Sequence, residues 1–223
     1  MAALIRLENV NKIYETQAGQ VTALDNISLE IREGEFVAIL GQSGSGKSTL
    51  MNILGCLDTP DSGHYFLGGR DMTRCSPALQ AQVRGSEIGF IFQGFHLIPS
   101  LSAQENVELP LVYRSIGREE RRRRAHESLC RVGLSSRVTH RPAELSGGQQ
   151  QRVAIARAIA LAPPLILADE PTGNLDSSSG NEIMQILREL HRDGHTIVLI
   201  THDNAIADTV PRRICIRDGR ALV

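Results

Sequence analysis

Apolar and polar positions along the chain follow two different periods, which predict strands and helices in alternation. Near the N-terminus, residues 3–10 (ALIRLENV) and 21–31 (VTALDNISLEI) mix the two kinds of residue as half-exposed antiparallel strands do. The run at 36–40 (FVAIL) is apolar throughout, which is typical of a buried parallel strand. Further strands are expected at 88–93, 164–170 and 196–203, a closing hairpin at 212–223, and helices at 47–57, 117–134 and 178–194.

The order of these elements predicts the fold class. Strands that alternate with helices favour an α/β fold, with a mostly parallel sheet, crossover helices and an N-terminal antiparallel β subdomain. The section from about 100 to 141 is mostly helical in pattern and is interpreted as an inserted α-helical subdomain. We expect a single domain over 1–223, in which 1–92 and 142–223 form the core and about 93–141 the helical subdomain.

Composition and charge change this picture little. Of 223 residues, 41% are hydrophobic and 22% charged, and the net charge of -1 provides no strong field that would favour nucleic acid. The cysteines are scattered and are expected to be reduced thiols, neither disulfides nor metal ligands: Cys56, Cys75, Cys130 and Cys215. The N-terminal MAALIRLENV is charged too early for a signal peptide, and the longest apolar window is interrupted by Arg157 and Pro163. Any membrane role is therefore expected to come through a partner.

A glycine-rich stretch lies between the first apolar strand and the first helix. GQSGSGKST, from Gly41 to Thr49, matches the phosphate loop G-x-x-x-x-G-K-[ST] in the strand–loop–helix setting that the motif requires. Its glycines let the backbone wrap a phosphate with N–H groups pointing inward, and the helix start adds positive potential. We expect Lys47 to reach the β- and γ-phosphates of ATP and Ser48 to ligate Mg²⁺. The other loop residues expected to bind ATP are Gly41, Ser43, Gly44, Ser45, Gly46 and Thr49.

Two acidic residues, Asp169 and Glu170, end the apolar stretch LILADE. Carboxylates at the carboxyl edge of a parallel sheet face the same crevice as the phosphate loop. Asp169 is expected to hold Mg²⁺ through water, and Glu170 to polarise the attacking water as a general base. The alternative is a pair of solvated charges that cap the next turn.

Two further polar residues come at predicted strand ends: Gln93 follows IGFIF, and His202 follows TIVLIT. A lone glutamine or histidine at such a position is more often a satisfied surface group than a catalytic one. Because both strands are expected to end at the crevice edge, Gln93 is also a candidate ligand of Mg²⁺ or of the attacking water. His202 is in the same way a candidate hydrogen-bond partner of the γ-phosphate.

A second helix start follows in LSGGQQQR. Ser146 is a suitable cap, and Gly147 and Gly148 occupy the first turn, where backbone N–H groups and the helix dipole favour an anion. The plain alternative is a capped helix with no ligand. Glycine in a helix costs up to about 1 kcal/mol relative to alanine, so two in succession suggest a close approach to something. A second copy, docked head to tail, could present Ser146, Gly147, Gly148 and Gln149 to the open γ-phosphate side of the first copy's nucleotide, and two-fold symmetry then gives two identical sites.

Taken in order, these motifs resemble the ATP-binding cassette (ABC) ATPases over essentially the whole chain. The set is Tyr14, GQSGSGKST, Gln93, LSGGQ, LILADE, GNLD at Gly173–Asp176, and His202. The resemblance implies a P-loop NTPase, RecA-like core, with ATP held between the phosphate loop of one subunit and the LSGGQ signature of the other. It also implies that Tyr14 stacks on adenine, that Asp176 bridges to the partner subunit, and that His202 is the switch histidine.

Longer stretches, among them STLMNILGCLDTPDSG, NVELPLVYR and ADEPTGNLDS, resemble the MacB-like macrolide-exporter and LolD-like lipoprotein-releasing ATPases. This implies an ATPase that forms a homodimer with ATP and Mg²⁺ and drives an integral membrane permease subunit from the cytoplasmic face of the inner (plasma) membrane. The chain ends at Val223, so a stand-alone subunit and an excised cassette are both open. The competing functions are a nucleotide-gated regulator of a membrane-bound partner with low turnover, and a soluble ABC ATPase outside transport.

Two surface features remain. From Phe95 to about Leu101 the chain is unusually apolar for a crevice edge. We hypothesise that this segment helps to form the groove for a cytoplasmic helix of the permease, against the alternative of plain subdomain core.

The run REERRRR at 118–124 is interpreted as a solvated helix face; a nucleic-acid patch and contact with anionic lipid headgroups are the alternatives.

Overall fold

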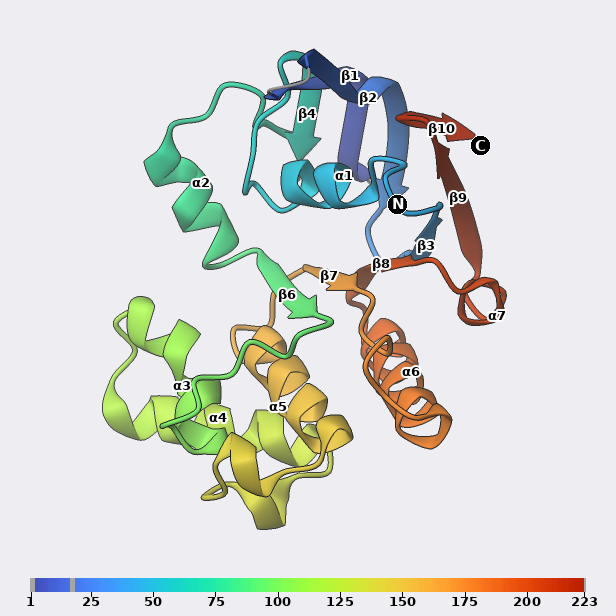
Figure 1. The fold of residues 1–223 in the computed structure, drawn as a ribbon. Coiled ribbons are helices and arrows are strands. Elements are labelled where there is room, and N and C mark those ends of the chain that lie inside the picture. The colour runs from blue at the N-terminus through green and yellow to red at the C-terminus, as the bar shows by residue number, and fades with distance from the viewer. Residues whose placement is uncertain (1–2, 17–18, 223) are drawn as a thin grey trace. The chain divides into compact units, whose positions relative to one another are not determined.

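The computed structural model describes residues 3–16 and 19–222 and falls into two compact units (Figure 1). Unit 1 comprises Met1–Arg84 and Gly194–Val223, and unit 2 comprises Gly85–Asp193. The fold is of the expected mixed α/β class, with antiparallel strands, parallel strands and helices. The predicted division into a core (1–92 and 142–223) and a helical subdomain (about 93–141) has other boundaries than these two units. That division stays a prediction.

The antiparallel sheet of unit 1 has the strand order β2-β1-β4-β5. Its strands are β1 (Ala3–Thr16), β2 (Gly19–Arg32), β4 (Ser62–Leu67) and β5 (Arg70–Asp71). Ile5 and Leu7 of β1 are buried while Arg6 between them is exposed, because successive side chains of a strand point to opposite faces. Both predicted N-terminal strands are confirmed, and the structure extends them.

Unit 1 also contains parallel strands, with β3 (Phe36–Leu40) in the middle. β3 pairs in parallel with β8 (Thr196–Thr201) and with β9 (Arg212–Arg217), and β10 (Arg220–Leu222) forms an antiparallel hairpin with β9. Every residue of β3 and β8 is buried, as strands covered on both faces require. The predicted buried strands and the closing hairpin are therefore confirmed.

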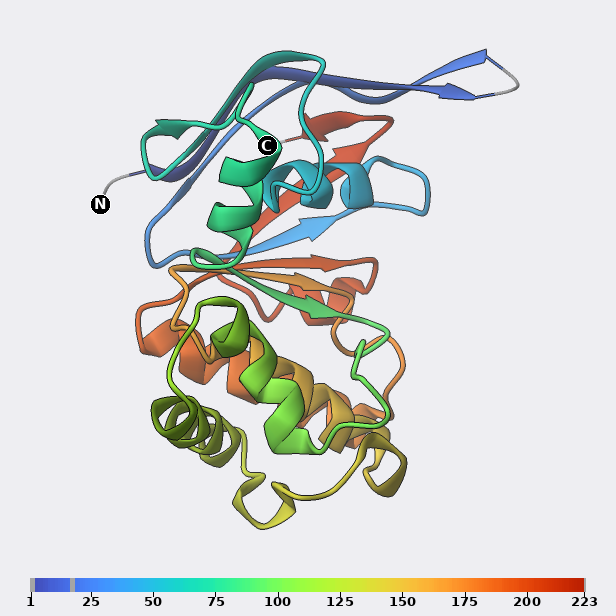
Figure 2. The same cartoon turned by 90° about the vertical axis from the view of Figure 1, so that its left-hand side faces the viewer.

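Helix α1 (Lys47–Leu54) begins after the loop that follows β3 and lies against the antiparallel sheet (Figure 2). The apolar side chains that it buries include Leu50 and Ile53, so the helical spacing predicts it correctly. Unit 1 has further helices at α2 (Pro77–Arg84) and α7 (Asn204–Ala207). The hydrophobic pattern does not predict α2, because that helix buries little of its surface.

In unit 2, β6 (Ile88–Phe92) pairs in parallel with β7 (Leu165–Asp169). The helices of this unit are α3 (Ala103–Tyr113), α4 (Arg118–Arg131), α5 (Gly147–Ile159) and α6 (Ser177–Arg192), with 3-10 turns η1 (Ser135–Arg137) and η2 (Pro142–Glu144). Helices α3, α4 and α5 pack against one another, as Figure 1 shows. Helix α6 buries Ile183, Leu187 and Leu190, which is the apolar stripe that its sequence spacing predicts.

Part of the charged run on α4 is paired within its own helix, whereas Arg121 donates to Glu108 of α3. Arg123 donates to Glu120 and Glu127, and Arg124 donates to Glu120. Hydrogen bonds from Arg123 and then Arg124 lower the pKa of Glu120 to about 2. This pairing supports the interpretation of the run as a solvated helix face.

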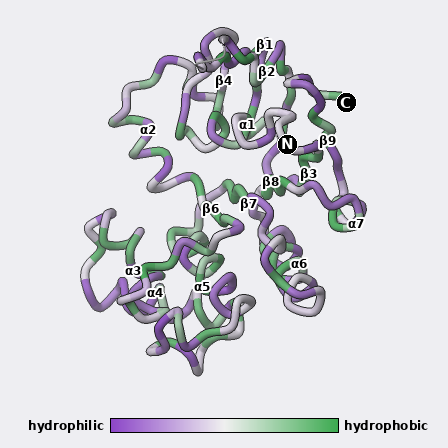
Figure 3. The backbone as a smooth tube through the Cα atoms, viewed as in Figure 1, coloured by the Kyte–Doolittle hydropathy of each residue, from purple (hydrophilic) through white to green (hydrophobic). Residues whose placement is uncertain are grey.

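Hydrophobic positions gather on the buried parallel strands, among them β6 and β8 (Figure 3). Within the part of the chain that the structure describes, no helix combines the length and the apolar character needed to cross a bilayer. Among the residues that the structure describes, the cysteines form no disulfide; Cys56 is buried, whereas Cys130 and Cys215 are exposed.

Candidate functional site

The phosphate loop joins the end of β3 to the start of α1. The backbone of two of its glycines lies in the left-handed region, with φ of 79° at Gly44 and 103° at Gly46. A Cβ added at Gly46 would lie 2.3 Å from the carbonyl oxygen of Ala23, and one at Gly41 would lie 2.4 Å from that of Ile216. At Gly41 and Gly46 the loop therefore passes too close to neighbouring backbone for any side chain.

The side chain of Lys47 lies across this loop. Its ammonium donates to the carbonyl oxygens of Gly41 at 2.6 Å and Gln42 at 2.7 Å, and the residue is buried. Ser45 Oγ is also buried and has no hydrogen-bond partner among the described residues, although buried polar groups normally have one. A glycine-wrapped loop at a helix start, with a lysine and an unpaired buried hydroxyl, fits the phosphates of a nucleotide. Ser48 is exposed and so is accessible to a hydrated metal ion.

His202 lies at the same sheet edge as the loop. Leu40, the last residue of β3, is paired in register with Thr201, the last residue of β8. Gly41 and His202 therefore follow at neighbouring strand ends, on the edge where α/β proteins bind ligands. This is the placement that the sequence predicts; the contact of His202 with a γ-phosphate stays a prediction.

Tyr14 belongs to β1, and its hydroxyl donates to Asp58 Oδ2 at 2.9 Å. The side chain of Thr49, the last residue of the phosphate-loop motif, is close enough to this hydroxyl to lower its pKa. Burial raises the pKa of Tyr14, and the hydrogen bond to Asp58 raises it further. Tyr14 is thus held near the phosphate loop. Ser43, within that loop, is exposed. Stacking of Tyr14 on adenine stays a prediction.

Unit 2 brings Gln93, Asp169 and Glu170 together. Phe92, the last residue of β6, is paired in register with Asp169, the last residue of β7, so Gln93 and Glu170 follow at neighbouring strand ends. Glu170 has a φ of 44°, a left-handed conformation that is costly for a residue with a Cβ. The N–H of Gly173 donates to the Glu170 carbonyl at 3.0 Å and closes the turn. Strained backbone of this kind clusters at functional sites, which supports the expected catalytic role of Glu170.

The turn after β7 holds the side chain of Gln93. Gln93 Nε2 donates to Asn174 Oδ1 at 3.2 Å, and Asn174 Nδ2 donates to the Gln93 carbonyl at 3.0 Å. A Cβ added at Gly173 would lie 2.7 Å from Gln93 Nε2. Both Gly173 and Asn174 of the GNLD motif therefore accommodate Gln93, a link that the sequence analysis missed.

Helix α5 is capped as the sequence predicts. Ser146 Oγ accepts from the N–H of Gln149 at 3.3 Å, and Gln149 Oε1 accepts from the N–H of Ser146 at 3.0 Å, which forms a capping box. A Cβ added at Gly148 would lie 2.9 Å from Ser179 Oγ, whereas one at Gly147 meets nothing closer than 3.4 Å. Part of the close approach inferred from these glycines is thus a contact within the chain, between α5 and α6.

Asp176 caps helix α6. Its carboxylate accepts from the N–H of Ser179 at 2.9 Å and from the Ser179 hydroxyl at 2.7 Å. These hydrogen bonds, the backbone one first, lower the pKa of Asp176. Ser179 therefore contacts Asp176 and approaches Gly148, so that the residues expected to act across a dimer interface are neighbours. Their contact with a second subunit stays a prediction.

Two residues of α5 that the sequence analysis missed hold the segment around Gln93. Gln151 is fully buried, and its Nε2 donates to the carbonyl oxygens of Phe92 at 3.2 Å and Pro171 at 2.8 Å. Arg157 donates to backbone carbonyls two and three residues beyond Gln93, and burial lowers the pKa of this arginine. Their positions in a mostly buried helix indicate internal contacts, but no sequence pattern identifies the carbonyls that they reach.

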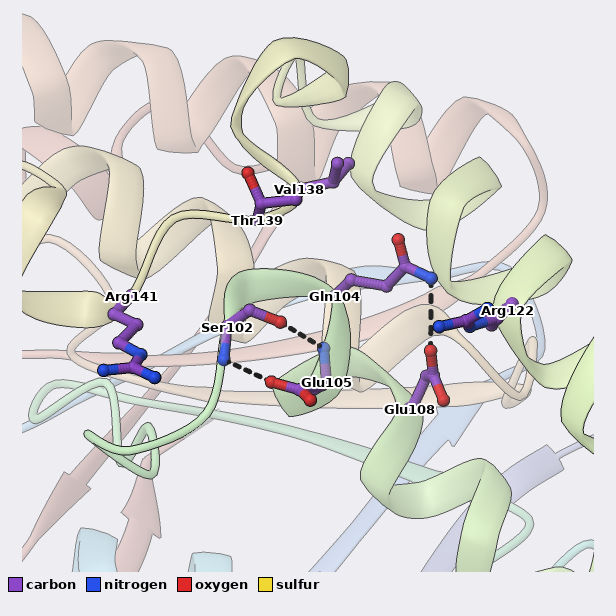
Figure 4. Close-up of a pocket in the computed structure, with 8 residues that line it drawn as sticks. All are labelled: Ser102, Gln104, Glu105, Glu108, Arg122, Val138, Thr139 and Arg141. Carbon is purple, nitrogen blue, oxygen red and sulfur yellow. Dashed lines mark hydrogen bonds between the residues drawn. The ribbon is translucent and has the colours of Figure 1, made fainter.

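Unit 2 also contains a polar pocket of about 510 Å³ (Figure 4). It is lined by residues from α3, from α4 and from the segment before the signature: Ser102, Gln104, Glu105, Glu108, Arg122, Val138, Thr139 and Arg141. Glu105 accepts from the N–H of Ser102 and Glu108 from the amide of Gln104, so both carboxylates are engaged within the chain. The lining shares no residue with the set expected to bind ATP.

Unit 1 thus gathers the phosphate loop, Tyr14 and His202, and unit 2 gathers the signature together with Gln93 and Glu170. The approach of one group to the other stays a prediction. A glycine loop with a lysine between a parallel strand and a helix defines a P-loop nucleotide-binding protein. More specifically, the chain belongs to the ABC transporter family, whose model matches residues 24–173, and it is an ATPase of this type.

Similar proteins agree with this assignment. The chain is 55% identical over 220 residues to the macrolide export ATP-binding/permease protein MacB of Salmonella typhimurium, a match that covers 99% of this chain and 34% of that protein. It thus spans about a third of the length of such relatives. It is 50% identical to the ABC transporter ATP-binding protein YvrO of Bacillus subtilis, over 99% of this chain and 96% of that one. The dimeric post-hydrolysis structure of the ATP-binding cassette MJ0796 with ADP and Pi has a TM-score of 0.90 and 48% identity, covering 98% of this chain and 97% of that one.

Proposed function

We propose that two copies of this chain close head to tail around two ATP molecules and that hydrolysis drives a membrane permease from its cytoplasmic face. The observation that supports this most directly is the start of α5. It is a capped helix N-terminus at which a Cβ added to Gly147 would meet nothing closer than 3.4 Å. Ser179, which approaches Gly148, bonds to Asp176. Such a start can receive the γ-phosphate side of a nucleotide whose other side is held by the phosphate loop of another copy. The MJ0796 cassette, at 48% identity, is dimeric.

In this proposal each polar residue has one task. Lys47 and the loop amides neutralise the phosphates, and Mg²⁺ is held by Ser48 with Gln93 and Asp169, partly through water. Glu170 takes the proton of the attacking water, and His202 donates to the γ-phosphate. The assignments of Lys47 and Ser48 rest on the phosphate loop at the start of α1. The others rest on the strand-end placement of the residues within each unit.

The permease is proposed because relatives such as MacB are named as ATP-binding/permease proteins and extend far beyond the length matched by this chain. The surface proposed to contact it is the segment from Phe95 to Leu101. Ile98 of that segment is 42% exposed, while its N–H donates to Asn106 Oδ1 at 2.8 Å. Asn106 is fully buried and also donates to the carbonyls of Ile98 and Leu101. The segment therefore combines exposed Ile98 and half-buried Phe95 and Leu97 with a fixed backbone, which suits docking of a helix.

The dimer is tested with Glu170→Gln, which removes the general base and should leave ATP binding intact. Light scattering in saturating ATP and Mg²⁺ should then find a dimer, which reverts to a monomer with ADP. Adding Gly147→Asp should abolish that dimer, because its carboxylate repels the γ-phosphate while suiting a helix N-terminus. Gly147→Ala, for which the structure has room, is the matched control and should keep the dimer.

A Glu170→Gln protein that stays monomeric with ATP would refute the head-to-tail closure. A dimer that survives Gly147→Asp would place the signature outside the interface. Steady-state turnover of the unmodified chain separates a driving ATPase from a nucleotide-gated regulator, since the regulator would close with ATP but release phosphate very slowly.

A further inference from the structure

The ring of Tyr14 is fixed by side chains from separate segments of unit 1. Its hydroxyl donates to Asp58 Oδ2 at 2.9 Å, and the Thr49 side chain lies near the same hydroxyl. The ammonium of Lys12 lies 5.3 Å from the centre of the ring, within the range of a cation–π contact. An aromatic side chain held at its hydroxyl and beside its face keeps little freedom to rotate.

Asp58 is itself held in place. Its Oδ1 accepts from Lys12 Nζ at 2.9 Å and from the N–H of Thr59 at 2.7 Å. Lys12 also donates to the Thr59 carbonyl at 2.9 Å and lies 3.5 Å from an oxygen of Asp61. Only 8% of Lys12 is exposed, and a buried ammonium requires such partners. The lysine therefore fixes the turn that carries Asp58.

The same turn is tied to the helix that follows the phosphate loop. The N–H groups of Leu57 and Asp58 both donate to the carbonyl of Asn52 in α1, at 2.8 Å and 3.2 Å. The other end of α1 carries Lys47 and Thr49 of the phosphate-loop motif. Asp58 thus connects the Tyr14 hydroxyl to the end of α1, and Thr49 near the start of the same helix lies close to that hydroxyl. The helix therefore helps to set the distance between the ring and the phosphate loop.

We propose that Asp58 and Lys12 are positioning residues, which hold the Tyr14 ring ready as the platform on which the nucleobase of ATP stacks. The proposal rests on the ATP binding of the proposed function and on the predicted stacking of Tyr14 on adenine. A ring that is ordered before the nucleotide arrives does not have to be ordered by binding, so affinity rises without a new contact. A stacking platform contacts the face of a base and not its edge, so the gain applies equally to adenine and guanine.

Asp58→Ala tests the proposal, because it removes the acceptor of the tyrosine hydroxyl and leaves the residues of the phosphate loop unchanged. We expect the Kd for ADP, measured by calorimetry, and the KM for ATP to rise about 5- to 10-fold, as for a lost hydrogen bond to a charged group. The KM for GTP should rise by the same factor, and kcat should not change. Inhibition by inorganic tripolyphosphate, which has no base, should also be unchanged.

A double-mutant cycle with Tyr14→Phe separates positioning from a general structural effect. The phenylalanine keeps the ring but cannot bond to Asp58, so Asp58→Ala should add no further loss in that background. Asp58→Asn keeps an acceptor for the hydroxyl and should cost less than Asp58→Ala. The matched control is Asp71→Ala, which removes a carboxylate on β5 that bonds to Thr73 and should leave the Kd for ADP unchanged.

The outcomes distinguish the two proposals. If Tyr14→Ala leaves the Kd for ADP unchanged, the base-stacking role itself is wrong, and the positioning role is wrong with it. If Tyr14→Ala weakens ADP but Asp58→Ala does not, stacking stands and the positioning role is refuted. An Asp58→Ala loss that persists in the Tyr14→Phe protein, or that extends to tripolyphosphate, also refutes it. If Asp58→Ala unfolds the protein, the Kd for ADP of Asp58→Asn is compared in its place, with and without Tyr14→Phe.

Discussion

Gln93 and Asn174 hold each other by two hydrogen bonds, one from each side-chain amide, although 81 positions separate them in the sequence. One is the glutamine that follows β6, and the other belongs to the GNLD turn that leads into Asp176. A movement of Gln93 therefore also displaces the turn before α6. This is a physical link, inside one chain, between a residue expected to contact Mg²⁺ or water and a residue expected to contact the second subunit.

The link predicts the effect of Asn174→Ala. Losing both hydrogen bonds should let Gln93 leave its position, and kcat should fall about 10-fold, which corresponds to about 1.4 kcal/mol. The Kd for ADP should not change, because the phosphate loop and Tyr14 lie in unit 1. Asn174→Asp keeps the acceptor for Gln93 Nε2 but loses the donor, and it should give an intermediate kcat. An unchanged kcat in Asn174→Ala would show that the pair is structural only.

A second prediction concerns the contact between the signature and α6. Gly148→Ala places a Cβ 2.9 Å from Ser179 Oγ and 3.0 Å from Ser179 Cβ, so the two helix starts must separate. We expect a loss of about 1–3 kcal/mol in the free energy of unfolding, measured by urea denaturation. Gly147→Ala, whose Cβ has room, should not lower the free energy of unfolding in this way. Combining Gly148→Ala with Ser179→Gly should recover part of the loss, and additive effects would contradict the clash.

A third prediction tests the segment from Phe95 to Leu101 as the permease contact. Ile98→Glu adds a charge to an exposed side chain, so the fold and the ATP-free monomer should survive. Burying that charge against an apolar partner would cost several kcal/mol, so the chain should no longer sediment with membranes from cells that make the whole transporter. Val112→Glu is the control, because Val112 is 47% exposed in the same unit but lies outside this segment. Equal recovery of both variants with membranes would refute the assignment.

Much of the fold could be predicted from the sequence, since the buried strands and amphipathic helices carry strong patterns. The phosphate loop and the signature cap could be predicted as well, because their chemistry depends on neighbouring residues in the chain. The strand-end placement of Gln93 and His202 follows from the rule that parallel strands share a carboxyl edge. Helix α2 could not be predicted from the sequence, because a helix that buries little apolar surface shows little periodicity in its hydrophobic positions.

The supporting contacts could not be predicted for a different reason. Gln151 reaches two backbone carbonyls, and Asp58 bonds to Tyr14 across 44 positions of sequence. Any polar residue can make such bonds, so residue type alone does not indicate the partner. Gly148 shows the same limit: the sequence indicates that something comes close, but only the fold identifies Ser179 as one neighbour.

The last prediction is the pH range over which the Tyr14 anchor contributes to stability. Burial alone would raise the pKa of Asp58, but hydrogen bonds from Lys12, Thr59 and Tyr14 outweigh it and hold the pKa below its ordinary 3.8. Burial alone would lower the pKa of Lys12, and Asp58 raises it above its ordinary 10.5. The stabilisation from Asp58 is therefore complete above pH 3.8 and lost as pH falls below it. That from Lys12 is complete below pH 10.5 and lost as pH rises above it.

Asp58→Asn should accordingly lower the free energy of unfolding by about 1–2 kcal/mol at pH 7, since the carboxylate is partly exposed. The difference from the unmodified chain should stay constant down to about pH 4 and shrink as pH falls below 3.8, because the carboxylate is then protonated, first in the unfolded chain and at lower pH in the folded one. Urea unfolding at a series of pH values measures this directly. Asp71→Asn serves as the comparison: Asp71 also has a lowered pKa, owing to hydrogen bonds from Thr73, but it has no contact with Tyr14. A difference for Asp58→Asn that stays constant as pH falls well below 3.8 would mean that the ionised carboxylate is not what holds the tyrosine.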